Sequence, residues 1–234
     1  MKILGLMAVL MALVACPSTP TPAPFTGDTP SLSGKIANWT AGKTGFLRVK
    51  MATNGTILGA AVLIGSDGSF SNLPFPGSAA IGTNLAAISS SITASLCGPD
   101  VPTVIVTPSN AKVAVGLLEV LNNTPASSGT VIEATRADEL SGNTQQVGDH
   151  FVLRIFADKA ATVKGACSQA GTQSKAGTFD FSLQAGWNNL ILELTSISET
   201  AVNVRYLAGE VPSNVQMFLA AFGAPLKTDD ILKH

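Results

Sequence analysis

The 234-residue chain is short of charge, of aromatic side chains and of histidine. Charged residues make up 12% of it, about half the share in an average soluble domain, and the net charge is only −1. This balance excludes the basic excess with which nucleic-acid-binding proteins neutralise phosphate. Apolar residues make up 46%, which is unlike a disordered chain, and the repeated apolar runs of about 20 residues that a multi-span membrane protein needs are absent. A neutral globular protein remains.

Catalytic motifs are also missing. The sequence has no His-x-His or His-Glu-x-x-His metal motif, no Gly-x-Ser-x-Gly elbow and no glycine-rich phosphate loop before a helix. Of the two histidines, His234 ends the chain and His150 follows Asp149 at the start of an expected strand. We interpret His150 as a polar strand start; the alternative is a metal ligand supported by the Asp149 carboxylate. We predict no catalytic residue, no metal and no cofactor, and we expect a plain turn at Asp67-Gly68.

The chain begins with an export signal. One lysine precedes an apolar run over residues 3–14, which is too short to cross a bilayer but typical of a signal peptide. The run ends in Leu13-Val14-Ala15-Cys16, which resembles the lipobox of bacterial lipoproteins. The resemblance implies removal of residues 1–15 and attachment of diacylglycerol and an acyl chain such as palmitate to Cys16. An ordinary secretory signal with a chance cysteine is the alternative.

A proline-rich stretch follows the lipobox. Residues 17–30 contain five prolines and four threonines, and proline neither donates a backbone hydrogen bond nor continues a helix. We interpret residues 16–30 as a lipidated cysteine followed by an extended tether, about 40 Å long at about 3.1 Å per residue. The absence of an acidic residue after Cys16 favours, by the same resemblance, the outer membrane or the cell surface.

Residues 31–225 are predicted to form an all-β domain, a mainly antiparallel, Greek-key-like β-sandwich with one or two short helices. Alternating apolar residues and turn signals predict the strands 31–39, 45–51, 57–64, 69–73, 101–106, 112–121, 130–135, 150–157, 163–167, 178–183, 189–195 and 201–207. Asn54-Gly55 predicts a hairpin with a type I′ turn. Residues 31–78 loosely resemble small β-sandwich modules of exported bacterial proteins, either as a separate module or as part of one sandwich.

Two segments show helical spacing instead. Residues 83–96 place apolar side chains three or four apart, although a strand pair competes with this interpretation. Residues 213–222 do the same, and Ser213 and Gln216 match a capping box. We therefore predict a C-terminal helix over 213–222, with a loose tail over 226–234.

Cysteine and tryptophan give the remaining site candidates. With Cys16 lipidated, Cys97 and Cys167 are left, and in an exported chain a disulfide between them is the simplest expectation; two separate buried thiols are the alternative. Trp39 and Trp187 stand at strand ends. We interpret both as caps on the core, with a carbohydrate-stacking role as the alternative.

These features predict a lipid-anchored envelope protein rather than an enzyme. We expect a structural, assembly or surface-layer-associated binding subunit, with the membrane and envelope or surface-layer proteins as partners and no nucleic acid. One alternative is a carrier of a lipid, pigment or sugar. Another is a redox enzyme, because an exported Greek-key sandwich with a disulfide resembles copper superoxide dismutases. That family's several copper-binding histidines have at most a reduced counterpart here, in His150 and His234.

Overall fold

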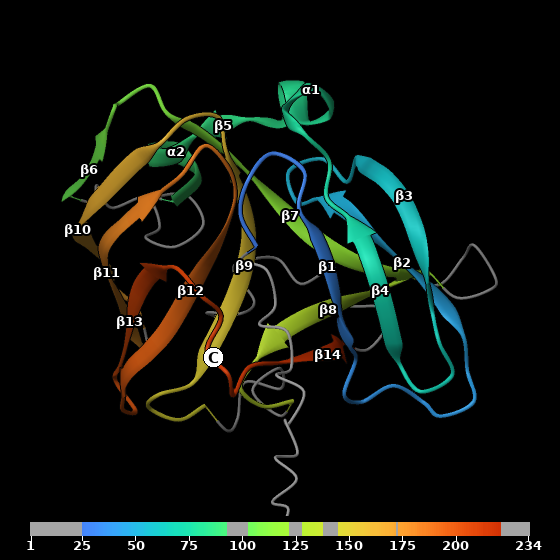
Figure 1. Cartoon of the computed structure of the whole chain (residues 1–234). Coiled ribbons are helices and arrows are strands. Elements are labelled where there is room, and N and C mark those ends of the chain that lie inside the picture. The colour runs from blue at the N-terminus through green and yellow to red at the C-terminus, as the bar shows by residue number, and fades with distance from the viewer. Residues whose placement is uncertain (1–24, 93–102, 122–127, 138–144, 172, 221–234) are drawn as a thin grey trace, which may run out of the picture.

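The computed structural model describes residues 25–92, 103–121, 128–137, 145–171 and 173–220 (Figure 1). Strands dominate these residues, and the fold is all-β and sandwich-like, as the sequence predicts. Strand pairing is antiparallel except between β11 and β13, which run parallel.

One long, strongly bent sheet runs across the whole molecule (Figure 1). Its order is β3 (Ile57–Ile64), β2 (Gly45–Met51), β7 (Lys112–Leu121), β8 (Ser128–Ala134), β9 (His150–Ala157), β12 (Gly186–Ile197), β13 (Ala201–Ala208), β11 (Ser174–Leu183), β10 (Ala161–Gln169) and β6 (Thr103–Thr107). Off this path, β14 (Gln216–Ala220) pairs with β8, and β5 (Ala86–Ala87) pairs with β7. A second, two-stranded sheet consists of β1 (Ser31–Lys35) and β4 (Ser69–Pro74).

The sheet carries two hydrophobic cores. The N-terminal core lies under the β1–β4 pair and includes Leu47, Val49, Leu73, Phe75, Val120 and Trp187. The C-terminal core is built mainly by β9 to β13 and includes Val163, Phe179, Leu192, Val204 and Tyr206. The central strands serve both cores, since on β8 Val131 packs in the N-terminal core while the next residue, Ile132, packs in the C-terminal one. This shared wall joins the two halves into one unit.

The predicted C-terminal helix over 213–222 is wrong. Residues 216–220 form β14, which pairs with β8 and places Met217 and Leu219 against the N-terminal core, Phe218 and Ala220 against the C-terminal core. Because β14 has apolar residues on both faces, it shows no alternation of polar and apolar residues, and its apolar residues matched helical spacing by coincidence.

The other predicted helix is shorter than expected. Residues 78–92 contain α1 (Ser78–Ile81), the 3₁₀ turn η1 (Gly82–Asn84) and α2 (Ile88–Ile92), with β5 between the last two. The rest of the predicted helix, residues 93–96, lies outside the described residues. The two-residue pairing of β5 with β7 ends any continuous helix, so the 83–96 prediction is correct only over α2.

The N-terminal strands share contacts with the rest of the described chain. β2 pairs with β7, and Ile36 forms a bridge with Met217 near the end of the described chain. Residues 31–78 therefore complete a core together with β7, β8 and Trp187 and do not enclose one of their own.

The N-terminal segment Phe25–Pro30 is docked on the domain, although the sequence assigned it to the tether. The Phe25 ring lies 4.6 Å from the Phe75 ring, centroid to centroid, and is almost fully buried. The Trp187 amide donates to the Gly27 carbonyl oxygen at 2.7 Å, an approach that only glycine permits at Gly186, where a Cβ would lie 2.4 Å from that oxygen. The tether prediction is thus corrected over residues 25–30, which pack on the domain; residues 16–24 lie outside the described residues.

Candidate functional site

The outer face of β3, β2 and β7 carries the clearest candidate site. β2 alternates as the sequence predicts, with Leu47, Val49 and Met51 in the core and the side chains between them outside. Of the six exposed large hydrophobic residues in the described ranges, three belong to this region: Phe46, Ile57 and Leu63. We define the outer patch as these three residues together with Arg48, Lys50 and Glu119.

Strand register brings the outer patch together. Phe46 pairs with Leu63 and Lys50 pairs with Ile57 across β2 and β3. Arg48 pairs with Glu119 across β2 and β7. Because directly paired residues project to the same side of a sheet, apolar groups stand at both ends of the patch and charged groups in its middle.

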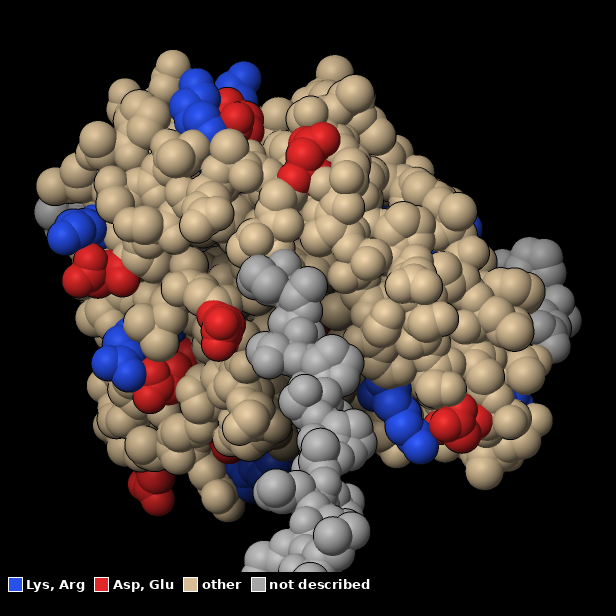
Figure 2. Space-filling view, viewed as in Figure 1, with Lys and Arg blue, Asp and Glu red and all other residues tan. Residues whose placement is uncertain are grey.

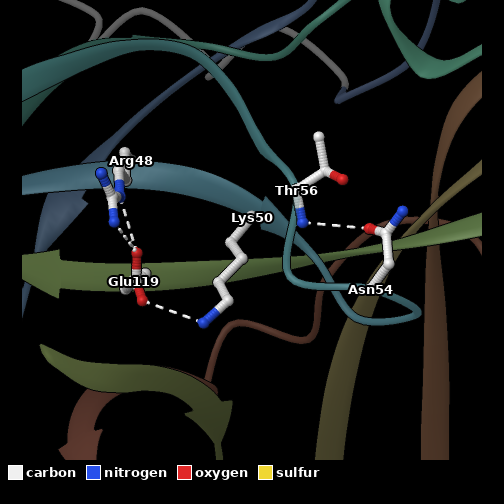
Figure 3. A network of polar contacts seen from close by, with 5 residues as sticks. All are labelled: Arg48, Lys50, Asn54, Thr56 and Glu119. Carbon is white, nitrogen blue, oxygen red and sulfur yellow. Dashed lines mark hydrogen bonds and ion pairs between the residues drawn. The ribbon is translucent and has the colours of Figure 1, made fainter. Parts of the chain in front are cut away.

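One carboxylate holds two cations in the middle of the patch (Figure 3). Arg48 Nε donates to Glu119 Oε2 at 2.6 Å, and Lys50 Nζ donates to Glu119 Oε1 at 3.1 Å. Glu119 is buried, while the side chains of Arg48 and Lys50 are 21% and 36% exposed. The patch therefore has a net charge of +1 that solvent and a partner can reach.

The β2–β3 hairpin closes one end of the patch. The predicted hairpin is confirmed, but the turn is a longer loop: the Met51 amide donates to the Thr56 carbonyl oxygen, and Gly55 alone of the Asn54-Gly55 pair has positive φ. A type I′ turn needs positive φ at both positions. The Asn54 side chain instead accepts from the Thr56 amide at 3.0 Å (Figure 3) and donates to Asn84.

A second ion cluster lies at the junction of the two cores. Glu133 of β8 and Arg154 of β9 form a two-pronged ion pair, with Arg154 Nε donating to Glu133 Oε2 at 2.7 Å. Arg154 also donates to Asn189 of β12, and the Phe25 ring covers its guanidinium at 4.3 Å. The two charged side chains are only 4% and 5% exposed, so this cluster is sealed from solvent.

His150 is not part of a metal site in the described residues. Asp149 accepts from Arg136 and from the Gln146 amide, both at 2.6 Å, and so is committed to its own loop. The His150 amide donates to Thr135, and its buried Nδ1 has no hydrogen-bond partner among the described residues. Within those residues no group of three or more His, Cys, Asp or Glu side chains is placed to hold an ion. His234 lies outside them.

Both tryptophans pack in or against the N-terminal core. Trp187 is fully buried, donates from Nε1 to the Pro76 carbonyl oxygen at 2.8 Å, and contacts the rings of Phe75 and Phe156 edge-on. This placement corrects the carbohydrate-stacking alternative for Trp187, because no ring face is exposed. Trp39 is partly buried against the N-terminal core and donates to the Lys43 carbonyl oxygen.

Of the three cysteines with a predicted role, only Cys167 lies within the described residues. Cys167 is buried in the C-terminal core and is not a free thiol. Its predicted partner Cys97 and the predicted lipid attachment site Cys16 lie outside the described residues, so the pairing and the lipidation stay predictions. The described helices are all too short to cross a membrane.

Two titratable groups have shifted pKa values. Hydrogen bonds from Ser69 to the exposed Asp67 carboxylate lower the pKa of that carboxyl, and Asp67-Gly68 lies in a turn between β3 and β4. Burial raises the pKa of the Tyr206 phenol well above its usual value of 10.

Charge is sparse on the face of the molecule that Figure 2 shows. Figure 2 shows small groups of mixed sign separated by broad uncharged areas, as the 12% charge content leads one to expect. The sequence analysis did not identify the outer patch. A usable signal was present, however: residues 57–64 form an eight-residue strand without a charge or a proline, and β2 beside it carries two cations.

Known proteins provide no further guide. The chain matches no family model, no curated protein and no solved structure. The geometry of its own residues therefore has to carry the functional argument.

Proposed function

We propose that the chain is a lipid-anchored protein of the bacterial cell envelope, in the outer membrane or at the cell surface, whose β domain is a non-catalytic binding or assembly subunit. Its partners would be envelope or surface-layer proteins. The anchor rests on the sequence, where an apolar signal segment ends in Leu13-Val14-Ala15-Cys16.

The outer patch is the observation that carries the binding role. It combines three exposed apolar side chains with two cations that share one carboxylate, at the β3 end of the main sheet. Grouped exposed apolar side chains mark protein contact surfaces, in which aromatic residues and arginine are enriched. The low charge content of the chain, 12%, supports the same role, since few charges would lose their water when a partner covers such a surface.

The position of Phe25 supports the anchored arrangement. Residues 16–24 would link the lipid to the first docked residue, and nine extended residues span about 28 Å. Because Phe25 is buried beside Trp187, the chain that links the lipid to the domain would enter the domain at a fixed position. A short tether of this kind keeps a binding domain close to envelope partners and raises their effective concentration.

Metabolic labelling tests the anchor. The full chain, expressed in bacteria that are fed an alkyne analogue of palmitate, should take up label and sediment with membranes. Cys16→Ser should lose both properties, while the neighbouring variant Ser18→Ala should keep them. Label retained by Cys16→Ser, or an unmodified chain that is unlabelled and soluble, would overturn the proposed anchor.

A cross-linking experiment tests the binding role separately. A photoreactive residue in place of Phe46 should give specific adducts with envelope proteins in intact cells, while the same residue in place of Val147, which is also exposed, should not. Equal adduct patterns from the two positions would count against the outer patch as the contact surface.

A further inference from the structure

We propose that strand β6 pairs antiparallel with β6 of a second copy of this chain, about a twofold axis at Ile105, so that the two main sheets join into one. The contact is made by a sheet edge in the C-terminal half of the molecule and does not involve the outer patch. The inference therefore goes beyond the proposed function, which concerns other envelope proteins.

The position of β6 is the first argument. β6 ends the order of the main sheet and lies at the margin of the molecule (Figure 1). Among the described residues it pairs with β10 alone, and no backbone hydrogen bond joins it to any other described segment. The other end of the sheet differs, because the chain turns back from β3 into β4 and the Gly65 amide donates to the Ser69 carbonyl oxygen at 2.8 Å. Within the described chain, β6 is thus the end of the main sheet that can extend it.

The regularity of β6 is the second argument. Its five residues pair with Thr162 to Ala166 without a register shift, so no bulge turns the edge away. Natural edge strands are usually protected by a charge, a proline or a bulge, and residues 103–107 contain none of these. All five are β-branched, which favours an extended strand. Ile105 is 66% exposed, more than any other large hydrophobic residue in the described ranges.

The sequence of β6 identifies the partner. Residues 102–108 read Pro-Thr-Val-Ile-Val-Thr-Pro in both directions. In an antiparallel pair centred on Ile105, each residue therefore meets its equivalent: Ile105 lies opposite the partner's Ile105, and Val104 opposite the partner's Val106. This register pairs all five residues of the strand. A shift by two residues would leave three pairs, and a shift by one would place the inner face of one strand level with the outer face of the other.

Both faces of β6 suit this pairing. Val104 and Val106 pack partly buried against the C-terminal core, and the partner's two valines would continue that core across the axis. On the outer face, Ile105 pairs with Lys164 of β10, whose Nζ lies 3.4 Å from Asp180. The row that reaches the axis therefore has no net charge, and two copies can approach without the repulsion that like charges on adjacent strands cause.

The size of the contact predicts where it forms. A pair of five-residue strands buries less than the roughly 1,000 Å² of a stable complex, so the dimer should be weak in dilute solution. Two copies held on one membrane by the proposed anchor would meet at a much higher effective concentration. The contact is isologous and uses the same edge of both copies, so it closes at two and cannot grow into a fibre.

Cysteine cross-linking tests the pairing in cells that express the full chain. Directly opposed residues of antiparallel strands have Cα atoms about 4.5 to 5.5 Å apart, within the range of a disulfide. On mild oxidation, Ile105→Cys should give a disulfide-linked dimer in at least tenfold higher yield than the unmodified chain. Thr107→Cys, which is exposed on the same strand, should stay at background, because its equivalent in the partner lies about 13 Å away. Leu63→Cys, similarly exposed on β3, should also stay at background.

The outcomes separate the pairing from other contacts. No dimer from Ile105→Cys, or an equal yield from Thr107→Cys or Leu63→Cys, would overturn the proposal. So would mass spectra showing that Ile105→Cys is linked to a different protein instead of a second copy. The same cross-link should form when Ile105→Cys is combined with Cys16→Ser and the protein is concentrated to about 1 mM, an effective concentration typical of tethered modules. The pairing can therefore be confirmed even if the anchor fails, and it can fail while the anchor is confirmed.

Discussion

Two glutamates on adjacent strands, Glu119 of β7 and Glu133 of β8, bind cations in opposite ways. Glu133 pairs one to one with Arg154, and Asn189 and the Phe25 ring complete the enclosure. Glu119 shares its two oxygens between Arg48 and Lys50, both of which remain in contact with solvent. A neutral, sealed cluster contributes to specifying the fold, whereas a cationic, open cluster is available to a partner. Both clusters pair a glutamate with an arginine. They differ in how deeply the cations are buried and in how many cations each glutamate binds.

Removing Glu133 should have the largest effect on stability. Glu133→Ala leaves Arg154 buried without its counter-ion, a change that typically costs about 3 to 5 kcal/mol of unfolding free energy. Urea denaturation measures this cost. In the double variant Glu133→Leu with Arg154→Met, an apolar pair replaces the ion pair, and most of the stability should return; a double variant as unstable as Glu133→Ala would contradict a sealed ion pair.

Removing the Phe25 ring, which covers Arg154 in the sealed cluster, should lower the free energy of unfolding by a smaller amount. Phe25→Ala removes a buried ring from a terminal segment that can adjust, so we expect a loss of about 2 to 3 kcal/mol, at the low end for a buried phenylalanine. Hydrogen exchange should localise the effect. The amides of Trp187 and Phe75, which bond to Gly27 and Pro30, should exchange faster, while that of Leu192 in the C-terminal core should not. Uniform acceleration across all three would mean that the segment is not a separate cover.

The open cluster should contribute least to stability. Glu119→Gln keeps the shape and one acceptor oxygen, and Arg48 and Lys50 can turn to solvent. The cost should be about 1 kcal/mol, in the range of partly exposed ion pairs, and it should shrink in 1 M salt. A loss equal to that of Glu133→Ala in the same urea titration would make the two clusters alike.

A pH measurement extends the comparison to the C-terminal core. The phenol of Tyr206 is buried there, and burial alone shifts its pKa. Tyr206 is the only tyrosine in the chain and stacks on Phe179 with ring centroids 4.6 Å apart. Because burial raises its pKa in the folded state, the folded protein holds the phenol proton at a pH at which the unfolded chain has lost it. Stability should therefore fall as pH rises above about 10. Absorbance at 295 nm should show tyrosinate at pH 11 only in unfolded protein; its appearance in the folded protein would contradict this burial.

The sequence predicted the strands that contain a long apolar run or a regular alternation, and it failed at the short strand β14. β2, β3, β7 and β9 have the predicted bounds, although β9 is buried on both faces. β14 was mistaken for a helix because its few apolar residues, which contact both cores, also fit helical spacing. Phe25 was assigned to the tether because proline content, a local property, outweighed a contact with Trp187 more than 160 residues away.

The outer patch could not be predicted for a related reason. Its members come from strands 70 residues apart in sequence, and only the order β3-β2-β7 places Glu119 beside Arg48. That β3 ends the order of the main sheet is likewise a property of topology. Local pattern identifies a strand, but the identity of its neighbours decides whether its charges are sealed or available.

The most direct test of the difference between the clusters is the yield of photo-adducts from position 46 with envelope proteins in intact cells, before and after Arg48→Glu. If the outer patch is the contact surface, a reversed charge in its middle should lower the yield about tenfold. An unchanged yield from a folded Arg48→Glu protein would contradict the assignment of the outer patch as the contact surface.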